Sequence, residues 1–163
     1  QTALALHHLI STQFRGDELT LIGFGLYAQT MTIEELTALP PIQEKGTNLQ
    51  HALLLADQFF ARHVNHDPTL LVVTDGEPTS IITDWGQPYF NWPTDRITLA
   101  KTVQALDQVT KRGASPTFFR LGEDPGLVNL LNAMANRSGG RVVAPDLGEL
   151  GGAVVGEYLR GWF

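Results

Sequence analysis

Short apolar runs alternate along this chain with longer segments of helical periodicity, and this alternation constrains the fold more than any other feature. The runs are nearly continuous, which is typical of strands covered on both faces, and the helical segments between them predict parallel pairing. Four runs have this character, at residues 18–25, 69–74, 116–121 and 141–144. The sequence therefore predicts an α/β fold of the Rossmann-like, doubly wound type, with a mostly parallel sheet and helices on both faces.

Capping residues mark where several of the helices begin. Thr32 and Glu35 form a capping-box pattern that predicts a short helix to about residue 39. Thr47, Thr94 and Asp124 stand at the starts of three longer helical segments, where hydroxyl and carboxylate oxygens can accept from free backbone N–H groups. The periodicity predicts helices over residues 3–14, 48–64, 94–112, 124–137 and 146–162, and a short edge strand over 27–31. No linker or internal repeat divides the chain, so we expect a single domain over residues 1–163.

The composition narrows the classes of function. The formal net charge is −6, which argues against a nucleic acid or an anionic membrane as the partner. The chain has no cysteine, and this excludes disulfides and cysteine-based zinc sites. No apolar run has the length needed to cross a bilayer, and no signal-peptide pattern is visible. Because the first residue is Gln1 and not Met, we also expect the chain to be part of something longer.

Asp75 is the residue best placed for chemistry. It follows the apolar run at 69–74 directly, and Gly76 then frees the backbone to turn sharply. In open α/β sheets, ligands bind beyond the carboxyl ends of the strands, which is where this carboxylate is expected. From the residues alone, Asp75 could bind a hard cation, act as a nucleophile or simply end the strand. Thr47, two residues after Lys45, could be a second oxygen ligand, the cap of the following helix, or both.

The segments LLVVTDGEPT (70–79) and KGTNL (45–49) resemble two of the metal-site loops of von Willebrand factor A (VWA) domains. The resemblance extends over essentially the whole chain through the order of helices and strands. It implies a metal-ion-dependent adhesion site, or MIDAS, for Mg²⁺, with Mn²⁺ or Ca²⁺ as alternatives, in which the Thr47 hydroxyl and the Asp75 carboxylate are ligands. The family's first loop, Asp-x-Ser-x-Ser, does not occur in these residues. We therefore expect that loop and the first central strand to lie before Gln1, which would make both the domain and its metal site incomplete here.

The closest resemblance is to intracellular bacterial VWA proteins, including the VWA subunit of magnesium chelatase and proteins encoded with MoxR-type AAA+ ATPases. It implies a protein-binding module, and not an enzyme, that engages its partner through the metal. An acidic side chain of the partner would fill the open coordination position, since Mg²⁺ takes six oxygen ligands in octahedral geometry. An adaptor or co-chaperone role beside a MoxR-type ATPase is the function that we expect from this resemblance.

Residues 77–93 form a long segment without helical periodicity that is rich in aromatic residues. Long loops in compact domains are more often functional than not. The aromatic side chains could cover a sheet edge or a helix end, or they could contact a partner. The candidate partner-binding residues of this segment are Glu77, Trp85, Tyr89, Phe90 and Trp92.

Three other functions compete with this interpretation. A haloacid-dehalogenase-like, Mg²⁺-dependent phosphohydrolase also places an aspartate after a buried strand, but Asp75-Gly76-Glu77 departs from its pattern. A Rossmann-type nucleotide binder would need a glycine-rich phosphate loop that the chain does not have. A VWA domain that has lost metal binding remains open, because the first loop is absent. The pairs at His7-His8 and at His63 and His66 have no third ligand in the sequence and are interpreted as surface or core residues.

Overall fold

The computed structural model describes residues 18–32, 34–35 and 46–160, and it divides the chain into two compact units. The first unit comprises Gln1–Leu19, Asn65–Asp75 and Ala114–Phe163. The second comprises Thr20–Val64 and Gly76–Gly113. The helix predicted over 3–14 lies outside the described residues.

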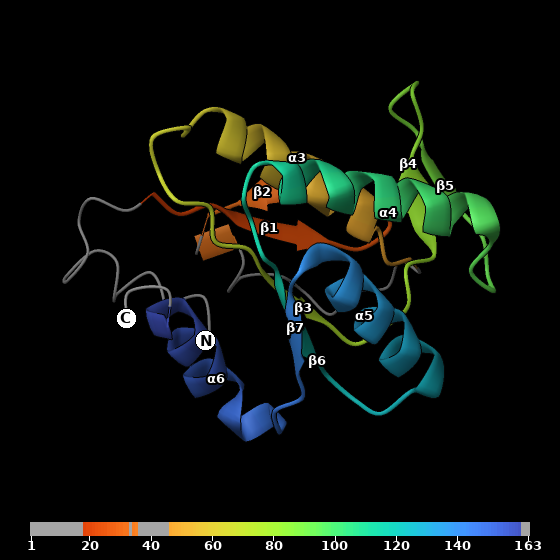
Figure 1. Ribbon diagram of the computed structural model, residues 1–163. Helices are drawn as coiled ribbons and strands as arrows, with labels where there is room; N and C mark the ends of the chain where they lie inside the picture. The colour runs from red at the N-terminus through yellow and green to blue at the C-terminus, as the bar shows by residue number, and fades with distance from the viewer. Residues whose placement is uncertain (1–17, 33, 36–45, 161–163) are drawn as a thin grey trace. The chain divides into compact units, whose positions relative to one another are not determined.

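The first unit contains a parallel sheet of three strands in the order β3-β6-β7 (Figure 1). The strands are β3 (Leu71–Thr74), β6 (Thr117–Arg120) and β7 (Arg141–Val143). Helix α5 (Pro125–Ser138) packs on β6 and β7, and helix α6 (Leu150–Arg160) packs on β6. The two helices lie on opposite sides of the sheet in Figure 1. This arrangement is the α/β fold with a parallel sheet and flanking helices that the sequence predicted.

Phe118 and Phe119 on β6 form the centre of the first unit, and both are fully buried. Successive side chains of a strand point to opposite faces, so one strand supplies both layers of the core. Phe119 packs with Val154 of α6 and with flanking aliphatic side chains that include Leu71 and Val143. Burial on both faces explains why β6 appears in the sequence as a continuous apolar run.

The described residues of the second unit include two hairpins and the helices α3 and α4. Strand β1 (Leu21–Phe24) pairs antiparallel with β2 (Ala28–Met31), and β4 (Ser80–Ile82) pairs antiparallel with β5 (Pro88–Phe90). Helix α3 (Leu49–Ala61) packs along helix α4 (Arg96–Lys111) and also contacts β1, β2 and β4 (Figure 1). The core between the helices is aliphatic and includes Leu53, Leu106 and Val109.

Two predictions for this unit are corrected. The strand predicted over 18–25 exists, but β1 belongs to a two-stranded antiparallel sheet and not to the parallel one. The reason is local, because the N–H of Gly25 donates to the carbonyl of Tyr27 and the chain turns straight back into β2. The segment 77–93 was predicted to lack regular structure, yet it contains the β4–β5 hairpin, closed by the Thr83–Gln87 turn.

The helix caps follow the predictions to within one residue. Asp124 caps α5 through the N–H of Leu127, as predicted. Asn48 caps α3 and Asp95 caps α4. The caps predicted at Thr47 and Thr94 are therefore each wrong by one position. In each case a side-chain carbonyl or carboxylate oxygen follows the threonine and reaches the free N–H groups better than the hydroxyl does.

Two further helices were predicted, one that begins near Thr32 and one over residues 146–162. The capping box is confirmed, because Thr32 and Glu35 exchange both of their hydrogen bonds, at 3.2 and 3.1 Å. The rest of the helix predicted to about residue 39 lies outside the described residues. The helix predicted over 146–162 begins as a 3₁₀ turn at Leu147–Glu149 and continues as α6. No helix in the described part of the chain is long and apolar enough to cross a membrane.

Candidate functional site

The backbone of Thr47 is hydrogen-bonded on both sides, whereas its hydroxyl has no hydrogen bond with the described residues. Its N–H donates to the hydroxyl of Thr79 at 2.9 Å, and its carbonyl accepts from the N–H groups of Thr79 and Ser80 at 3.0 and 3.2 Å. These bonds fix the turn before α3 against the start of β4. The Thr47 hydroxyl makes no hydrogen bond with any described residue, and it lies 3.5 Å from the position that a Cβ on Gly76 would occupy. The hydroxyl is therefore available to a ligand.

Asp75 ends the segment that contains β3, and its side chain is exposed. The preceding residue, Thr74, accepts the N–H of Leu121 at 2.9 Å, so ordered pairing with β6 continues to the last residue of the strand. The Asp75 carboxylate forms no hydrogen bond or ion pair with the described residues. A rigid strand thus delivers an unengaged carboxylate at its carboxyl end.

The structure places these two predicted ligands in different units, Asp75 in the first and Thr47 in the second. What it brings together directly is Thr47 and Gly76, the residue that follows Asp75 in the chain. Among the described residues, no group of three or more His, Asp or Glu side chains could hold a metal ion. The donors present are a hydroxyl and a carboxylate, which is the oxygen chemistry that Mg²⁺ prefers. The chemistry of each donor, taken by itself, therefore fits such a site.

The aromatic residues of the β4–β5 region differ in exposure. Trp85 is 85% exposed and Trp92 is 64% exposed, whereas Phe90 and Tyr89 are 42% and 37% exposed. Glu77, at the start of the segment, is half-buried. The two tryptophans therefore present large apolar surfaces to solvent, which is typical of residues that contact a partner.

Tyr89 also has a structural role. Its hydroxyl donates to the Asp95 carboxylate at 2.8 Å, and the same oxygen accepts from the Asn91 amide at 3.0 Å. The other Asp95 oxygen accepts from the N–H of Thr98 as the α4 cap. The hydrogen bonds from Thr98, Tyr89 and Asn91 lower the pKa of Asp95 to about 2, and the bond to Asp95 raises the pKa of Tyr89. This cluster fastens β5 to the start of α4.

Several polar residues that were not singled out from the sequence connect the start of α3 to the Leu26 carbonyl and to β4. The carbonyl of Leu26 accepts from the amide of Asn48 and from the hydroxyl of Ser80, both at 3.0 Å. The side chain of Gln50 accepts the N–H of Ile82 at 2.9 Å. Asn48, Gln50 and Ser80 are all buried. Buried polar residues at the start of an otherwise apolar helix were the available signal, since such groups are rarely buried without partners.

We expect the stability of the second unit to decrease as pH falls through the His51 titration. His51 Nδ1 accepts the N–H of Ala28 at 2.8 Å, and burial lowers the pKa of His51 below its ordinary value. The unfolded chain therefore binds a proton at a pH where the folded chain does not. Stability is fully present above the ordinary pKa of about 6.5 and is lost as pH falls from there toward the lower folded value.

The measurement is thermal unfolding between about pH 8 and pH 5, compared with a His51→Asn variant that keeps an acceptor near Nδ1 but does not titrate. The wild-type melting temperature should fall more steeply with decreasing pH. Equal slopes for the two proteins would contradict the role of His51.

The geometry described above, a parallel sheet with flanking helices and an Asp-Gly turn at the end of a buried strand, agrees with a VWA-type domain. The chain belongs to the family described as Rv0959-like protein, vWA domain, whose model matches residues 1–159. It is 51% identical over 164 residues to the uncharacterized protein Rv0959 of Mycobacterium tuberculosis (strain H37Rv) and to the uncharacterized protein Mb0984 of Mycobacterium bovis. The match covers 98% of this chain and 24% of each relative, so the chain spans about a quarter of their length. VWA domains commonly mediate protein interactions, and this is the class of function that membership of the family supports.

Proposed function

We propose that this chain is a metal-ion-dependent protein-interaction module and not an enzyme. The observation that carries the proposal is an unengaged Thr47 hydroxyl close to Gly76, the residue that directly follows the unengaged Asp75 in the chain. Membership of a VWA family supports the same function.

In this proposal Thr47 and Asp75 hold part of the coordination shell of Mg²⁺, or of Mn²⁺ or Ca²⁺. The bound cation would supply an open coordination position for a carboxylate of the partner protein. The chain's own contribution is orientation. The backbone bonds between Thr47 and the Thr79–Ser80 segment fix the hydroxyl, and pairing of β3 with β6 fixes the strand that ends at Asp75.

The segment after the turn gives the partner a second type of contact. Glu77 follows the turn, and the exposed side chains of Trp85, Phe90 and Trp92 lie further along the same segment. Large exposed aromatic residues are typical of interface anchors. We include a MoxR-type AAA+ ATPase as the partner, and a cytoplasmic location, in the proposal because the chain resembles intracellular bacterial VWA proteins of that type.

Replacing Asp75 with alanine in the full-length gene product should weaken Mn²⁺ or Mg²⁺ binding at least tenfold, because a charged ligand of a hard cation is lost. The fold should be retained, since the side chain is exposed and has no partner among the described residues. Isothermal titration with MnCl₂ measures the effect. Glu123→Ala, which removes an exposed carboxylate after β6, is the matched control and should leave the affinity unchanged.

Equal Mn²⁺ affinity in wild type and Asp75→Ala would reduce Asp75 to a strand-ending residue. Absence of Mn²⁺ binding in the wild-type gene product would identify a VWA domain that has lost its metal. Mg²⁺-dependent hydrolysis of a phosphate ester that Asp75→Ala abolishes would favour the phosphohydrolase alternative instead.

A further inference from the structure

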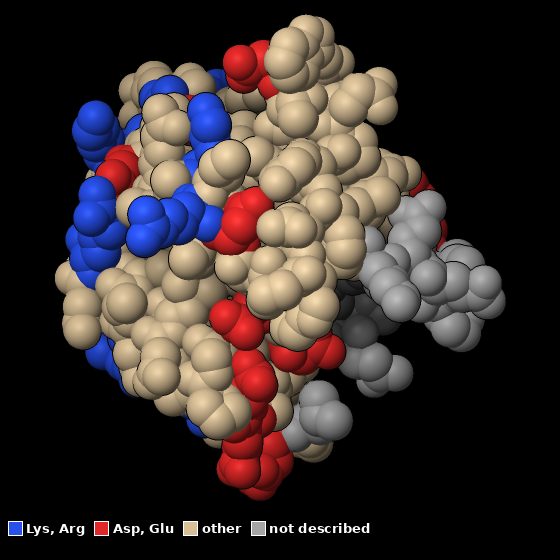
Figure 2. All heavy atoms as spheres, turned by 90° about the vertical axis from the view of Figure 1, so that its right-hand side faces the viewer, with Lys and Arg blue, Asp and Glu red and all other residues tan. Residues whose placement is uncertain are grey.

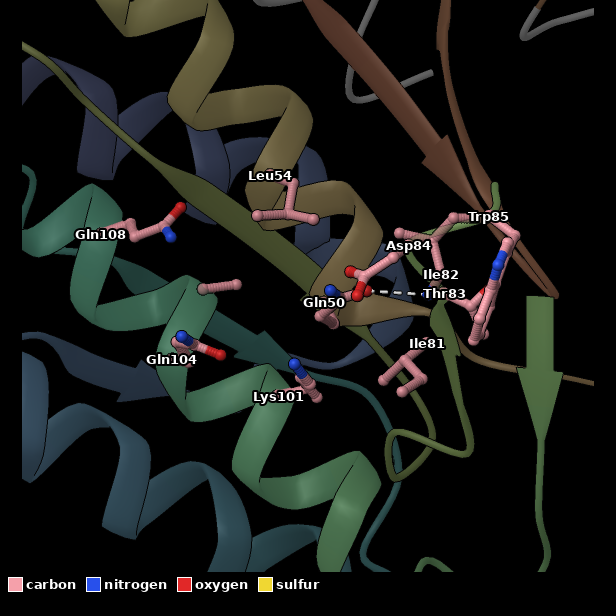
Figure 3. A pocket seen from close by; sticks show the side chains of 11 residues that line it. Gln50, Leu54, Ile81, Ile82, Thr83, Asp84, Trp85, Lys101, Gln104 and Gln108 are labelled. Atoms are coloured by element: carbon pink, nitrogen blue, oxygen red, sulfur yellow. Dashed lines mark hydrogen bonds between the residues drawn. The ribbon is translucent and has the colours of Figure 1, made fainter. Parts of the chain in front are cut away.

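A groove in the second unit lies between helix α4, helix α3 and the β4–β5 hairpin, and it has a volume of about 360 Å³ (Figure 3). Its floor is apolar and is formed by Leu54, Ile81 and Ala105, of which Ile81 and Ala105 are buried. The volume lies at the lower end of the range for ligand-binding pockets. It suits one or two side chains better than a large cofactor.

One wall of the groove is a polar face of α4. Lys101, Gln104 and Gln108 line it, and their spacing of three and four residues places them on the same side of the helix. All three side chains are exposed, and none has a hydrogen bond or an ion pair within the described part of the chain. This wall therefore offers one positive charge and two amides that no described residue engages.

The opposite wall carries the opposite charge. Asp84 and Trp85, at the turn of the hairpin, also line the groove. In Figure 3 the Asp84 side chain points toward the helices, whereas the indole of Trp85 lies on the outer side of the hairpin. Trp85 is 85% exposed, and the Asp84 carboxylate forms no ion pair with any residue that the structure describes. A carboxylate without an ion pair is suited to a cationic side chain of a partner.

Amide side chains indicate what kind of molecule the groove accepts. Gln50 also lines it, and although its carbonyl oxygen accepts from the N–H of Ile82, its NH₂ group remains a donor. With Gln104 and Gln108 this gives three glutamines, and each amide can pair with the N–H or C=O groups of a peptide backbone. The floor accepts an aliphatic side chain by burial of apolar surface.

We propose that this groove docks a segment of a partner protein in which an aliphatic residue lies between an acidic and a basic residue. The aliphatic side chain covers Ile81 and Leu54. The acidic side chain pairs with Lys101, and the basic one pairs with Asp84. The contact goes beyond the proposed metal-dependent function because it uses neither Thr47 nor Asp75 and needs no cation. The two ideas can therefore fail independently.

The test is a selection of phage-displayed random peptides against the full-length gene product in EDTA, so that no metal contributes. We expect enrichment of sequences with an aliphatic residue flanked by Asp or Glu on one side and by Lys or Arg on the other. Affinities of a synthesised winner are then measured by isothermal titration. Lys101→Glu should weaken binding about tenfold, because it replaces an attraction by a repulsion. Replacing the acid of the peptide with lysine should restore binding to that variant.

Lys111→Glu is the matched control, because it makes the same change of charge on an exposed position of α4 outside the groove. It should leave the affinity unchanged. Gln104→Ala, which alters no charge, is a second variant and should weaken binding severalfold if the amides contact the peptide. Failure to enrich the mixed-charge pattern, or equal affinity for wild type, Lys101→Glu and Gln104→Ala, would overturn the proposal.

Discussion

Replacing Gly140 with alanine should destabilise the first unit by about 3 kcal/mol or more, because the new methyl group has no space. A Cβ built on Gly140 would overlap the carbonyl oxygen of Pro116, which is backbone and cannot rotate away. The same oxygen accepts the N–H of Arg141 at 3.0 Å, at the start of the pairing between β6 and β7. The clash therefore acts on the sheet itself, next to Phe118 and Phe119 at the centre of the core.

Hydrogen exchange followed by mass spectrometry measures this effect within a larger protein. Amides of β6 and β7 should exchange about a hundredfold faster in Gly140→Ala than in wild type, if they exchange through opening of this unit. Unchanged protection would show that the chain shifts to accept the methyl group at little cost.

Two other glycines of the same unit serve as controls. Gly139 ends α5 with φ of 70° and has nothing within 4 Å of an added Cβ, so Gly139→Ala should cost only the strain of about 1 kcal/mol. Gly152 lies on the exposed side of α6, again with nothing within 4 Å, and Gly152→Ala should stabilise the helix by up to about 1 kcal/mol. The three substitutions add the same atom, so their different outcomes separate steric overlap, backbone strain and helix propensity.

The parallel sheet of the first unit could be predicted from the sequence because its strands are covered on both faces. Phe118 and Phe119 are both buried, so β6 appears as an uninterrupted apolar run and its neighbours follow the same rule. The hairpins of the second unit lack that signal. All four residues of β1 are half-buried, and their antiparallel partner is set by the turn at Gly25, which the apolar pattern does not encode. The β4–β5 hairpin was missed because Tyr89 and Phe90 are exposed on a three-residue strand.

The candidate site shows the same division. Asp75 was predicted as a site residue because it follows an apolar strand, and the structure places it at the end of the β3 segment. The groove beside α4 was not predicted, because Lys101 and Gln104 look like ordinary solvent-facing helix residues. Only folding places them in one groove with Asp84 and Trp85. The net charge of −6 was also a poor guide to local surface, since basic and acidic side chains are both exposed on the face shown in Figure 2.

Asn48→Ala should destabilise the second unit by about 2–2.5 kcal/mol, although the sequence analysis assigned the cap of α3 to its neighbour. Asn48 is fully buried, and its side-chain oxygen accepts the N–H of His51 at 2.9 Å. Its amide donates to the carbonyl of Leu26 at 3.0 Å. Alanine removes a cap worth about 1 kcal/mol, and it also removes the amide that donates to the Leu26 carbonyl, a second buried hydrogen bond worth about 1–1.5 kcal/mol.

Exchange of the amides in the first turns of α3 should accelerate by about thirtyfold or more, since each 1.4 kcal/mol corresponds to a factor of about ten. Asn48→Ser keeps a capping oxygen but loses the bond to Leu26, and it should give a smaller acceleration. An acceleration as large in Asn48→Ser as in Asn48→Ala would show that the Leu26 bond, and not the cap, provides the stability.

Thr47→Val, at the neighbouring position, should have the opposite effect. We expect Asn48 to contribute to the stability of α3 and Thr47 to contribute to metal binding. Valine matches the shape of threonine and leaves the backbone bonds of residue 47 to Thr79 and Ser80 in place. It removes only a hydroxyl that no described residue engages. Exchange in α3 should therefore stay at the wild-type rate, while Mn²⁺ affinity falls as it does in Asp75→Ala. Faster exchange in Thr47→Val would mean that the hydroxyl stabilises the turn. The case for Thr47 as a ligand would then lose its main support, which is that the fold itself makes no use of this oxygen.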